Sequence, residues 1–297
     1  MVYNIRDNIH KLLKYSKKQE LPPTGYFEKL PSQIIFNHLM EYSPILVSRL
    51  GSVETSSICG FQKFGKLKPD QIIELQRNAG FYYSNINELS NFVDLTIQGI
   101  KSADILAYWD CPGQYSLLNF YAREKIYVKL SDLETYKFGQ DWLSNLPVKK
   151  ICVVSPFINT MKNQIKYLND IHPKSDFVKH NFVFVRSPQT NGSYKYKMGD
   201  MTWVEQLSLM KQSVKLLDPD LVLIGAGSYG TPLGGILKKD GYSSVVCGGA
   251  LQIIFGIRGL RWDAREDYRS LFNDFWTRVI PEETPAGHDD IEGGCYW

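Results

Sequence analysis

The chain has 297 residues, of which 43% are hydrophobic and 22% charged, a composition typical of a globular protein with a buried core. Its formal net charge of +3 is too small to indicate nucleic-acid binding, and the absence of any run of about 18 apolar residues excludes a membrane-spanning helix. The five cysteines are scattered without a C-x-x-C pair, so we expect no disulfide scaffold, no structural zinc site and a cytoplasmic location.

Residues 1–44 are predicted to form an N-terminal helical extension. The first 19 residues have the pattern of a short basic amphipathic helix and lack the apolar core of a signal peptide. We expect this helix to pack on the domain, with peripheral contact to an anionic membrane surface, such as the cytoplasmic face of the inner membrane, as the alternative.

Strands and helices alternate through the rest of the chain. Strands are predicted at residues 44–50, 104–109, 149–157, 181–188, 221–225 and 242–249, and helices at residues 54–64, 70–80, 86–103, 159–171, 202–217 and 231–241. This order predicts an α/β fold with a Rossmann-like, doubly wound, mostly parallel sheet flanked by helices. Residues 45–297 are expected to form this domain, with a subdomain boundary near residue 148 as an alternative.

The segment Gly225-Ala226-Gly227-Ser228-Tyr229-Gly230 fits the pattern G-x-G-x-x-G between a strand and a helix. Backbone N–H groups at such a turn form an anion site, although a tight turn without a ligand has the same pattern. A dinucleotide site also needs a carboxylate about 20 residues later, and residues 245–249 contain none. This absence weakens the prediction of a nicotinamide-dependent oxidoreductase, while Gly248 and Gly249 indicate a second place where ligand approaches the backbone.

Polar residues follow several other predicted strands. Arg49 can clamp a phosphate, and Glu54 can act as a general base or bind a divalent cation. The alternative is that Arg49 and Glu54 form a surface ion pair and that Ser52 caps the helix. Ser155 and Asp110 follow two further strands, where Ser155 is also suited to cap the next helix.

A glycine-rich strand end is followed by Gln252, Arg258, Arg261 and Trp262. These residues suit an electropositive wall beside a diphosphate with Trp262 as a stacking surface, and a solvated arginine pair with a core tryptophan is the alternative. No G-x-S-x-G elbow, Walker lysine or H-E-x-x-H motif is present, so hydrolase, nucleoside triphosphatase and metalloprotease functions lack support.

The segment Arg49-Leu50-Gly51-Ser52-Val53-Glu54 resembles the R-F-G-D-G-E segment of bacterial glycosyltransferases with the GT-D fold. The closing E-G-G-C-Y-W resembles the end of related uncharacterised proteins from surface-polysaccharide gene clusters. The resemblance continues in order through residues 78–81, 154–157, the helix around Trp203, residues 223–230 and residues 248–262.

This resemblance implies transfer of a sugar from a nucleotide-diphosphate donor, usually a UDP-sugar, to a glycan or lipid-linked glycan acceptor of a cell-surface polysaccharide such as a capsule or O-antigen. It also implies a divalent metal, Mn²⁺ or Mg²⁺, held by a D-x-E motif. Glu54 matches the glutamate of that motif, but Ser52 stands at the aspartate position. A hydroxyl is a poor ligand for a hard cation, so the metal, and even activity itself, stay open.

From strand-end placement and the resemblance together, we expect Arg49 and Glu54 to act at the reaction centre with Arg258 and Arg261 stabilising the leaving group. The alternatives are an NAD(P)-dependent oxidoreductase and a non-catalytic nucleotide-binding or scaffold protein of a polysaccharide assembly complex. The residues expected to bind substrate are Gly51, Ser52, Asp110, Ser155, Gly225, Gly227, Ser228, Tyr229, Gly230, Gly248, Gly249, Gln252 and Trp262.

Overall fold

The structure is a computed structural model that describes residues 31–82, 86–136, 141–189 and 201–297. The predicted amphipathic helix within residues 1–19 lies outside these ranges, whereas helix α2, Pro31–Glu41, belongs to the described part of the N-terminal extension. Within the described ranges, every helix is too short or too polar to cross a bilayer.

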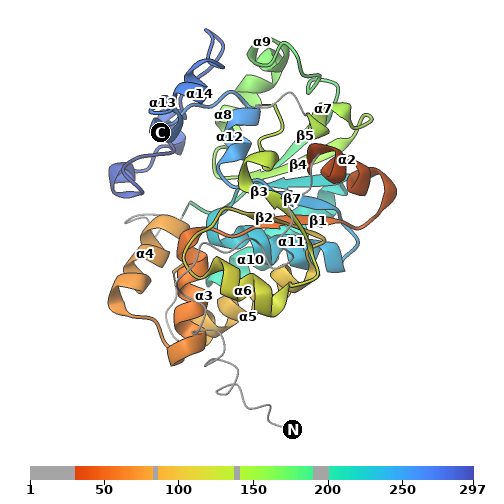
Figure 1. The fold of residues 1–297 in the computed structure, drawn as a ribbon. Coiled ribbons are helices and arrows are strands. Elements are labelled where there is room, and N and C mark those ends of the chain that lie inside the picture. The colour runs from red at the N-terminus through yellow and green to blue at the C-terminus, as the bar shows by residue number, and fades with distance from the viewer. Residues whose placement is uncertain (1–30, 83–85, 137–140, 190–200) are drawn as a thin grey trace.

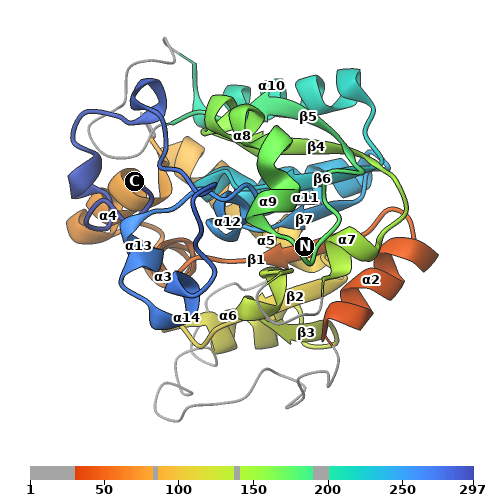
Figure 2. The same cartoon turned by 90° about the horizontal axis from the view of Figure 1, so that it is seen from above.

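Seven parallel strands form one sheet in the order β3-β2-β1-β7-β6-β4-β5, which confirms the predicted doubly wound parallel fold (Figures 1 and 2). Central strand β1 joins the two parts of the sheet, since Val47 pairs with Ile105 of β2 and with Val245 of β7. Strands from both sides of residue 148 therefore share the sheet. The strands are β1 Leu46–Arg49, β2 Ile105–Tyr108, β3 Ile126–Lys129, β4 Lys150–Ser155, β5 Asn181–Arg186, β6 Leu221–Ile224 and β7 Ser244–Val246.

Alternate residues of each strand belong to separate cores on the two faces of the sheet. In β1, Leu46 packs into one core and Val47 into the other, as the period of two in a strand requires. The first core is covered by α3 Ser52–Phe64, α4 Pro69–Ala79, α5 Ile86–Ser102, α6 Gln114–Tyr121, α10 Trp203–Leu217 and α11 Gly230–Lys239 (Figure 1). The second core is covered by α2, α7 Trp142–Asn145, α8 Ile158–Gln164, α9 Leu168–Ile171 and α12 Ala250–Ile254.

Local signals in the sequence explain where several helices begin and end. Helix α4 begins with Pro69 and stops before Gly80, which has a left-handed φ of 71°. Helix α10 begins with a capping box, in which Thr202 and Glu205 satisfy each other's backbone N–H groups. The helix predicted at residues 159–171 is instead split into α8, a 3₁₀ turn and α9. The split follows Gln164, whose buried side chain donates a hydrogen bond to the carbonyl of Phe275.

Helices on alternating faces follow the four neighbouring strands β1, β7, β6 and β4. Helices α3 and α11, which follow β1 and β6, lie on the first core, whereas α12 and α8, which follow β7 and β4, lie on the second. Adjacent strands whose connections leave on opposite faces open a crevice at their carboxyl ends, and open α/β sheets bind ligands there. The fold therefore places a crevice above the middle of the sheet.

Candidate functional site

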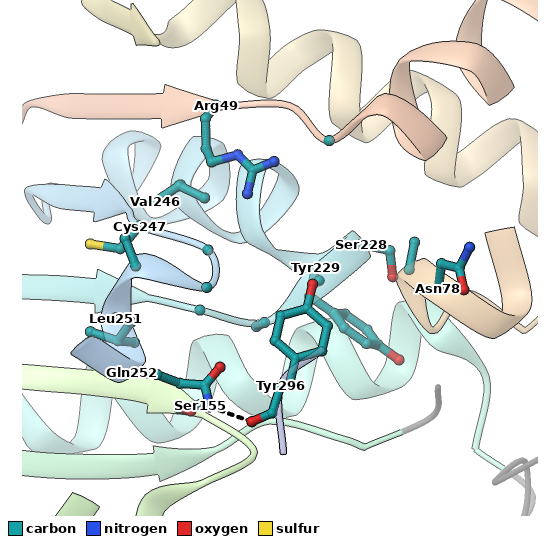
Figure 3. Close-up of a pocket in the computed structure, with 18 of the residues that line it drawn as sticks. Arg49, Asn78, Ser155, Ser228, Tyr229, Val246, Cys247, Leu251, Gln252 and Tyr296 are labelled. Atoms are coloured by element: carbon teal, nitrogen blue, oxygen red, sulfur yellow. Dashed lines mark hydrogen bonds between the residues drawn. The ribbon is translucent and has the colours of Figure 1, made fainter. Parts of the chain in front are cut away.

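A cavity of about 500 Å³ lies at the carboxyl ends of the strands (Figure 3). Its walls come from the ends of the seven strands, from helix α13, Leu260–Asp263, and from residues 292–297. The predicted site residues that line it are Arg49, Gly51, Ser52, Glu54, Ser155, Gly225, Gly227, Ser228, Tyr229, Gly248, Gly249, Gln252, Arg261 and Trp262.

Three of the predicted residues do not line this cavity. The Arg258 guanidinium is bound to Asp263 Oδ1 at 3.1 Å and lies over the ring of Phe272. Asp110 accepts a hydrogen bond of 3.2 Å from the Tyr108 hydroxyl. Gly230 begins α11, where a Cβ atom would lie 2.9 Å from a methyl group of β7, so its glycine serves the packing of helix on strand.

The turn after β6 is tightly packed against its neighbours. A Cβ atom at Gly225 would lie 2.8 Å from the Gly248 carbonyl oxygen, and one at Gly227, where φ is 52°, would lie 2.8 Å from the Ala79 carbonyl oxygen. The glycines are therefore required by packing as well as by access to the backbone. Ser228 accepts a hydrogen bond from the Trp203 indole, which stacks on the Tyr229 ring with centroids 5.0 Å apart. Through these two contacts Trp203 fixes the shape of the turn.

Arg49 points from the end of β1 toward the turn after β7 (Figure 3). Gly248 has a φ of 58°, and a Cβ atom there would collide with Arg49 Nη1, so the guanidinium lies directly on this turn. Arg49 Nη2 donates to the carbonyl of Leu50 at 3.3 Å. Its Nε atom is buried and has no hydrogen-bond partner in the described part of the chain. Arg49 is therefore a positioned cation with a donor left for an anion.

Glu54 lies in the first turn of α3, and its carboxylate folds back over Gly51, where a Cβ atom would collide with Oε2. Burial raises the pKa of Glu54 above its ordinary value of 4.5, and the charge of Glu292 raises the pKa further, against the opposing effect of Arg49. A carboxylate of raised pKa is a stronger base once ionised. Glu54 is thus suited to accept a proton from a bound hydroxyl.

Residues 292–297 fold around Arg261. Arg261 Nη2 contacts Glu292 Oε2, lies 3.1 Å from Cys295 Sγ and donates to the Tyr296 hydroxyl at 3.4 Å. The guanidinium also lies over the Tyr296 ring, 4.7 Å from its centroid. Three consecutive left-handed residues, Glu292 to Gly294, with φ values of 48°, 68° and 72°, turn the chain back to make these contacts. Burial raises the pKa of Tyr296 to about 12, so its hydroxyl stays protonated at neutral pH.

Gln252 and Ser187 bring buried hydrogen-bonding atoms to the cavity. Gln252 Nε2 donates to the Tyr296 carbonyl at 2.9 Å, which fixes the amide orientation (Figure 3). Each side chain is only 2% exposed, and neither Gln252 Oε1 nor Ser187 Oγ has a partner among the described residues. An unsatisfied buried polar atom costs about 1–3 kcal/mol, so these two atoms indicate a polar ligand.

Sequence reasoning assigned no role to several residues that line the cavity. Glu292 and Tyr296 stood in the closing E-G-G-C-Y-W segment, whose glycines were the available signal of a special turn. Ser187 and Trp109 directly follow predicted strands, so their position was the signal, whereas Glu134 and Tyr268 carry none.

The side chains present do not fit a divalent-metal site. Mg²⁺ and Mn²⁺ prefer several oxygen ligands, but Ser52 occupies the place of the expected aspartate and Glu292 is paired with Arg261. The described residues contain no group of three or more His, Cys, Asp or Glu arranged to hold a metal ion. The cavity is instead lined by three arginines, of which Arg265 is paired with Asp267, while Arg49 and Arg261 are placed for a negatively charged ligand.

No family model and no curated protein matches this chain. One solved structure is similar to it, described as "Selenomethionine substituted structure of domain of unknown function 1792 (DUF1792)". The TM-score is 0.48 at 12% sequence identity, and the match covers 95% of this chain and 98% of that one.

Proposed function

We propose that the protein is a glycosyltransferase that moves a sugar from a nucleotide-diphosphate donor, with UDP as the nucleotide, to a glycan acceptor. One observation carries this proposal: the cavity places Arg49 and Glu54 side by side on the β1–α3 connection, next to the glycine turns that follow β6 and β7. A cation and backbone amides suit a diphosphate, and a carboxylate of raised pKa beside them suits removal of a proton.

The proposed chemistry divides between these groups. Backbone amides of residues 226–228 and of Gly249 hold the diphosphate, and Arg49 with Arg261 stabilises the charge that grows on it as its bond to the sugar breaks. Glu54 takes the proton of the acceptor hydroxyl, whose oxygen forms the new bond to the anomeric carbon. The step releases the nucleoside diphosphate and a protonated Glu54, and it needs only groups present in the cavity.

Gln252 adds specificity to the donor site. Because its Nε2 is committed to the Tyr296 carbonyl, its Oε1 accepts a hydrogen bond from an N–H or O–H group of the ligand. A ribose hydroxyl or the imide N–H of uracil supplies such a donor. From the resemblance in sequence, the acceptor is a growing surface polysaccharide, free or lipid-linked, on the cytoplasmic side of a bacterial membrane.

Ligand binding followed by thermal unfolding tests this function, because a ligand that binds only the folded state raises the midpoint. UDP and UDP-sugars are expected to raise the midpoint with no requirement for Mn²⁺, and NADH to leave it unchanged. Stabilisation by NADH without UDP would instead establish the oxidoreductase alternative. A protein that binds UDP but neither transfers nor hydrolyses any UDP-sugar would be a non-catalytic binding component.

A further inference from the structure

The cavity extends beyond the donor groups to the other side of β1. On one side of β1, strands β7, β6, β4 and β5 are followed by the glycine turns, Gln252, Ser155 and Ser187, and we call these residues the donor half. On the other side of β1 the lining includes Trp109 after β2 and Glu134 after β3, together with Tyr268 of helix α14, Glu266–Arg269. We call these three residues the β2–β3 half.

Trp109 differs from the other aromatic residues of the cavity in its exposure. Its side chain is 39% exposed, compared with 3% for Trp262, 2% for Tyr229 and 0% for Tyr268. The ring is nevertheless held in place, since its indole N–H donates to the Leu50 carbonyl at 2.9 Å. Its backbone N–H also donates to a glutamine side chain of α6 at 3.2 Å. An indole fixed by hydrogen bonds, with open surface inside a cavity, is a flat platform available to a ligand.

The platform lies next to the proposed base. Arg49 pairs with Ala107 in the parallel β1–β2 register, so Trp109 leaves its strand beside residues 50 and 51. The hydrogen bond from the indole to Leu50 confirms this neighbourhood. Because the carboxylate of Glu54 folds over Gly51, a ring resting on Trp109 has the base at its edge.

The rest of the β2–β3 half is polar. Glu134 accepts a hydrogen bond from the Tyr268 hydroxyl, and the Tyr268 ring is covered by the Arg265 guanidinium at 4.5 Å. An aromatic face and a carboxylate that line the same part of a cavity suit a pyranose, which has an apolar C–H face and a rim of hydroxyl donors. A nucleobase is flat as well, but the unpartnered Gln252 Oε1 and Ser187 Oγ that suit its polar edge lie in the donor half.

We propose that Trp109 and Glu134 form the subsite for the acceptor sugar, with Trp109 as its platform and Glu134 as the acceptor of its hydroxyl hydrogens. This proposal rests on the proposed glycosyltransferase function. It assigns recognition of the acceptor to the β2–β3 half and places the reacting hydroxyl against Glu54, opposite the diphosphate.

The test measures binding of three probes, the methyl β-glycosides of glucose, galactose and N-acetylglucosamine, to the full chain saturated with UDP. The readouts are saturation-transfer NMR and tryptophan fluorescence. The fluorescence of the other tryptophans is measured in the W109F variant and subtracted. At least one glycoside is expected to bind saturably, and W109A or E134Q to weaken it about tenfold, while UDP affinity stays within twofold. F120A removes an equally exposed ring outside the cavity, and it should change neither affinity.

Two outcomes would overturn the subsite. If W109A weakens UDP tenfold, the platform serves the nucleobase; if no glycoside binds, or binding is unchanged in W109A and E134Q, the half does not recognise sugar. W109F keeps a ring of similar shape, so it preserves glycoside binding even if W109A fails to fold. Failure of the proposed function has a different signature, because the wild-type chain would then either not bind UDP or bind it without transferring or hydrolysing any UDP-sugar.

Discussion

The two halves of the cavity are built by different means. The donor half presents main-chain groups from turns whose glycines are fixed by close packing, with Arg49 resting on one of them and buried acceptor and donor atoms around it. The β2–β3 half presents side chains, with an exposed indole and a carboxylate held by Tyr268. A diphosphate is common to many donors and suits recognition by backbone, whereas an acceptor is particular and suits recognition by side chains, which change without disturbing the fold.

Glu54 stands between the halves, and its loss is expected to have the largest effect. E54Q removes the proposed general base and should lower the transfer rate about a thousandfold, since such catalysis contributes roughly 10²–10⁴. UDP affinity and glycoside affinity should both persist, because neither half is altered. The matched control E41Q changes an exposed glutamate on α2 and should leave the rate unchanged. Wild-type transfer by E54Q would remove Glu54 from the mechanism.

The pH dependence of transfer is the next largest effect. The pKa of Glu54 is raised, so the residue is protonated at pH values where an ordinary glutamate is ionised. The rate should therefore fall about tenfold for each pH unit below that raised pKa, with a midpoint above 4.5, as measured from kcat against pH.

The same shift has a consequence for stability. Since the folded state binds this proton more tightly than the unfolded chain, its contribution is present at low pH and is lost as pH rises through the raised pKa. E54Q should therefore unfold at a higher temperature than the wild type at neutral pH, with the difference shrinking toward pH 4.5. A difference that grows in acid would contradict the burial of this carboxyl.

A single methyl group tests the donor half. G248A places a Cβ atom against Arg49 Nη1 and should weaken UDP binding roughly ten- to hundredfold, the value of a charge-assisted hydrogen bond of about 1.5–3 kcal/mol. G65A is the matched control, because Gly65 has a similar φ of 67° but no atom within 4 Å of its Cβ position. Both variants carry about 1 kcal/mol of left-handed strain, so calorimetry with UDP separates strain from displacement of Arg49. Equal affinities in the two variants would show that Arg49 does not bind the diphosphate.

The smallest expected effect concerns Glu292. Its carboxylate holds Arg261 where a diphosphate would also bind, so E292Q should strengthen UDP binding by a few-fold. Loss of this negative charge should also lower the pKa of Glu54 and shift the acid limb of the rate to lower pH. E282Q, on an exposed glutamate ten residues earlier, serves as the control. Weaker binding in E292Q would mean that Glu292 positions Arg261 rather than competing for it.

The same contrast separates what sequence predicted from what it missed. Alternating strands and helices predicted the parallel sheet, and strand ends near glycines pointed to Arg49, Glu54 and Gln252. Strand β3 is as short as β1, β2 and β6, but it lies at the edge of the sheet and is only partly buried, so it lacks their continuous apolar run and the segment that carries Glu134 had no predicted place. Tyr268 reaches Glu134 across 134 positions, a contact that depends on tertiary packing. A site built from backbone groups is marked in the sequence by a glycine pattern, whereas a site built from side chains has no such pattern.

Arg258 illustrates the opposite error. The sequence gives no reason to distinguish Arg258 from Arg261. In the structure Arg258 lies beside Asp263 outside the cavity, whereas Arg261 faces the cavity. The two side chains point in different directions because Arg261 lies in the short helix α13 and Arg258 lies before it. No pattern in the sequence specified the turn that precedes α13.

The pairing of β1 with β7 also governs how the molecule assembles. These neighbours are far apart in the sequence, since Leu46 pairs with Ser244. During synthesis β1–β3 emerge long before β7, and one edge of β1 has no partner until then. Such distant pairing slows folding and leaves an open strand edge that attracts other chains. Because Arg49 and Gly248 meet only where β1 pairs with β7, a nascent chain stalled before β7 lacks this contact and, with it, the proposed donor site.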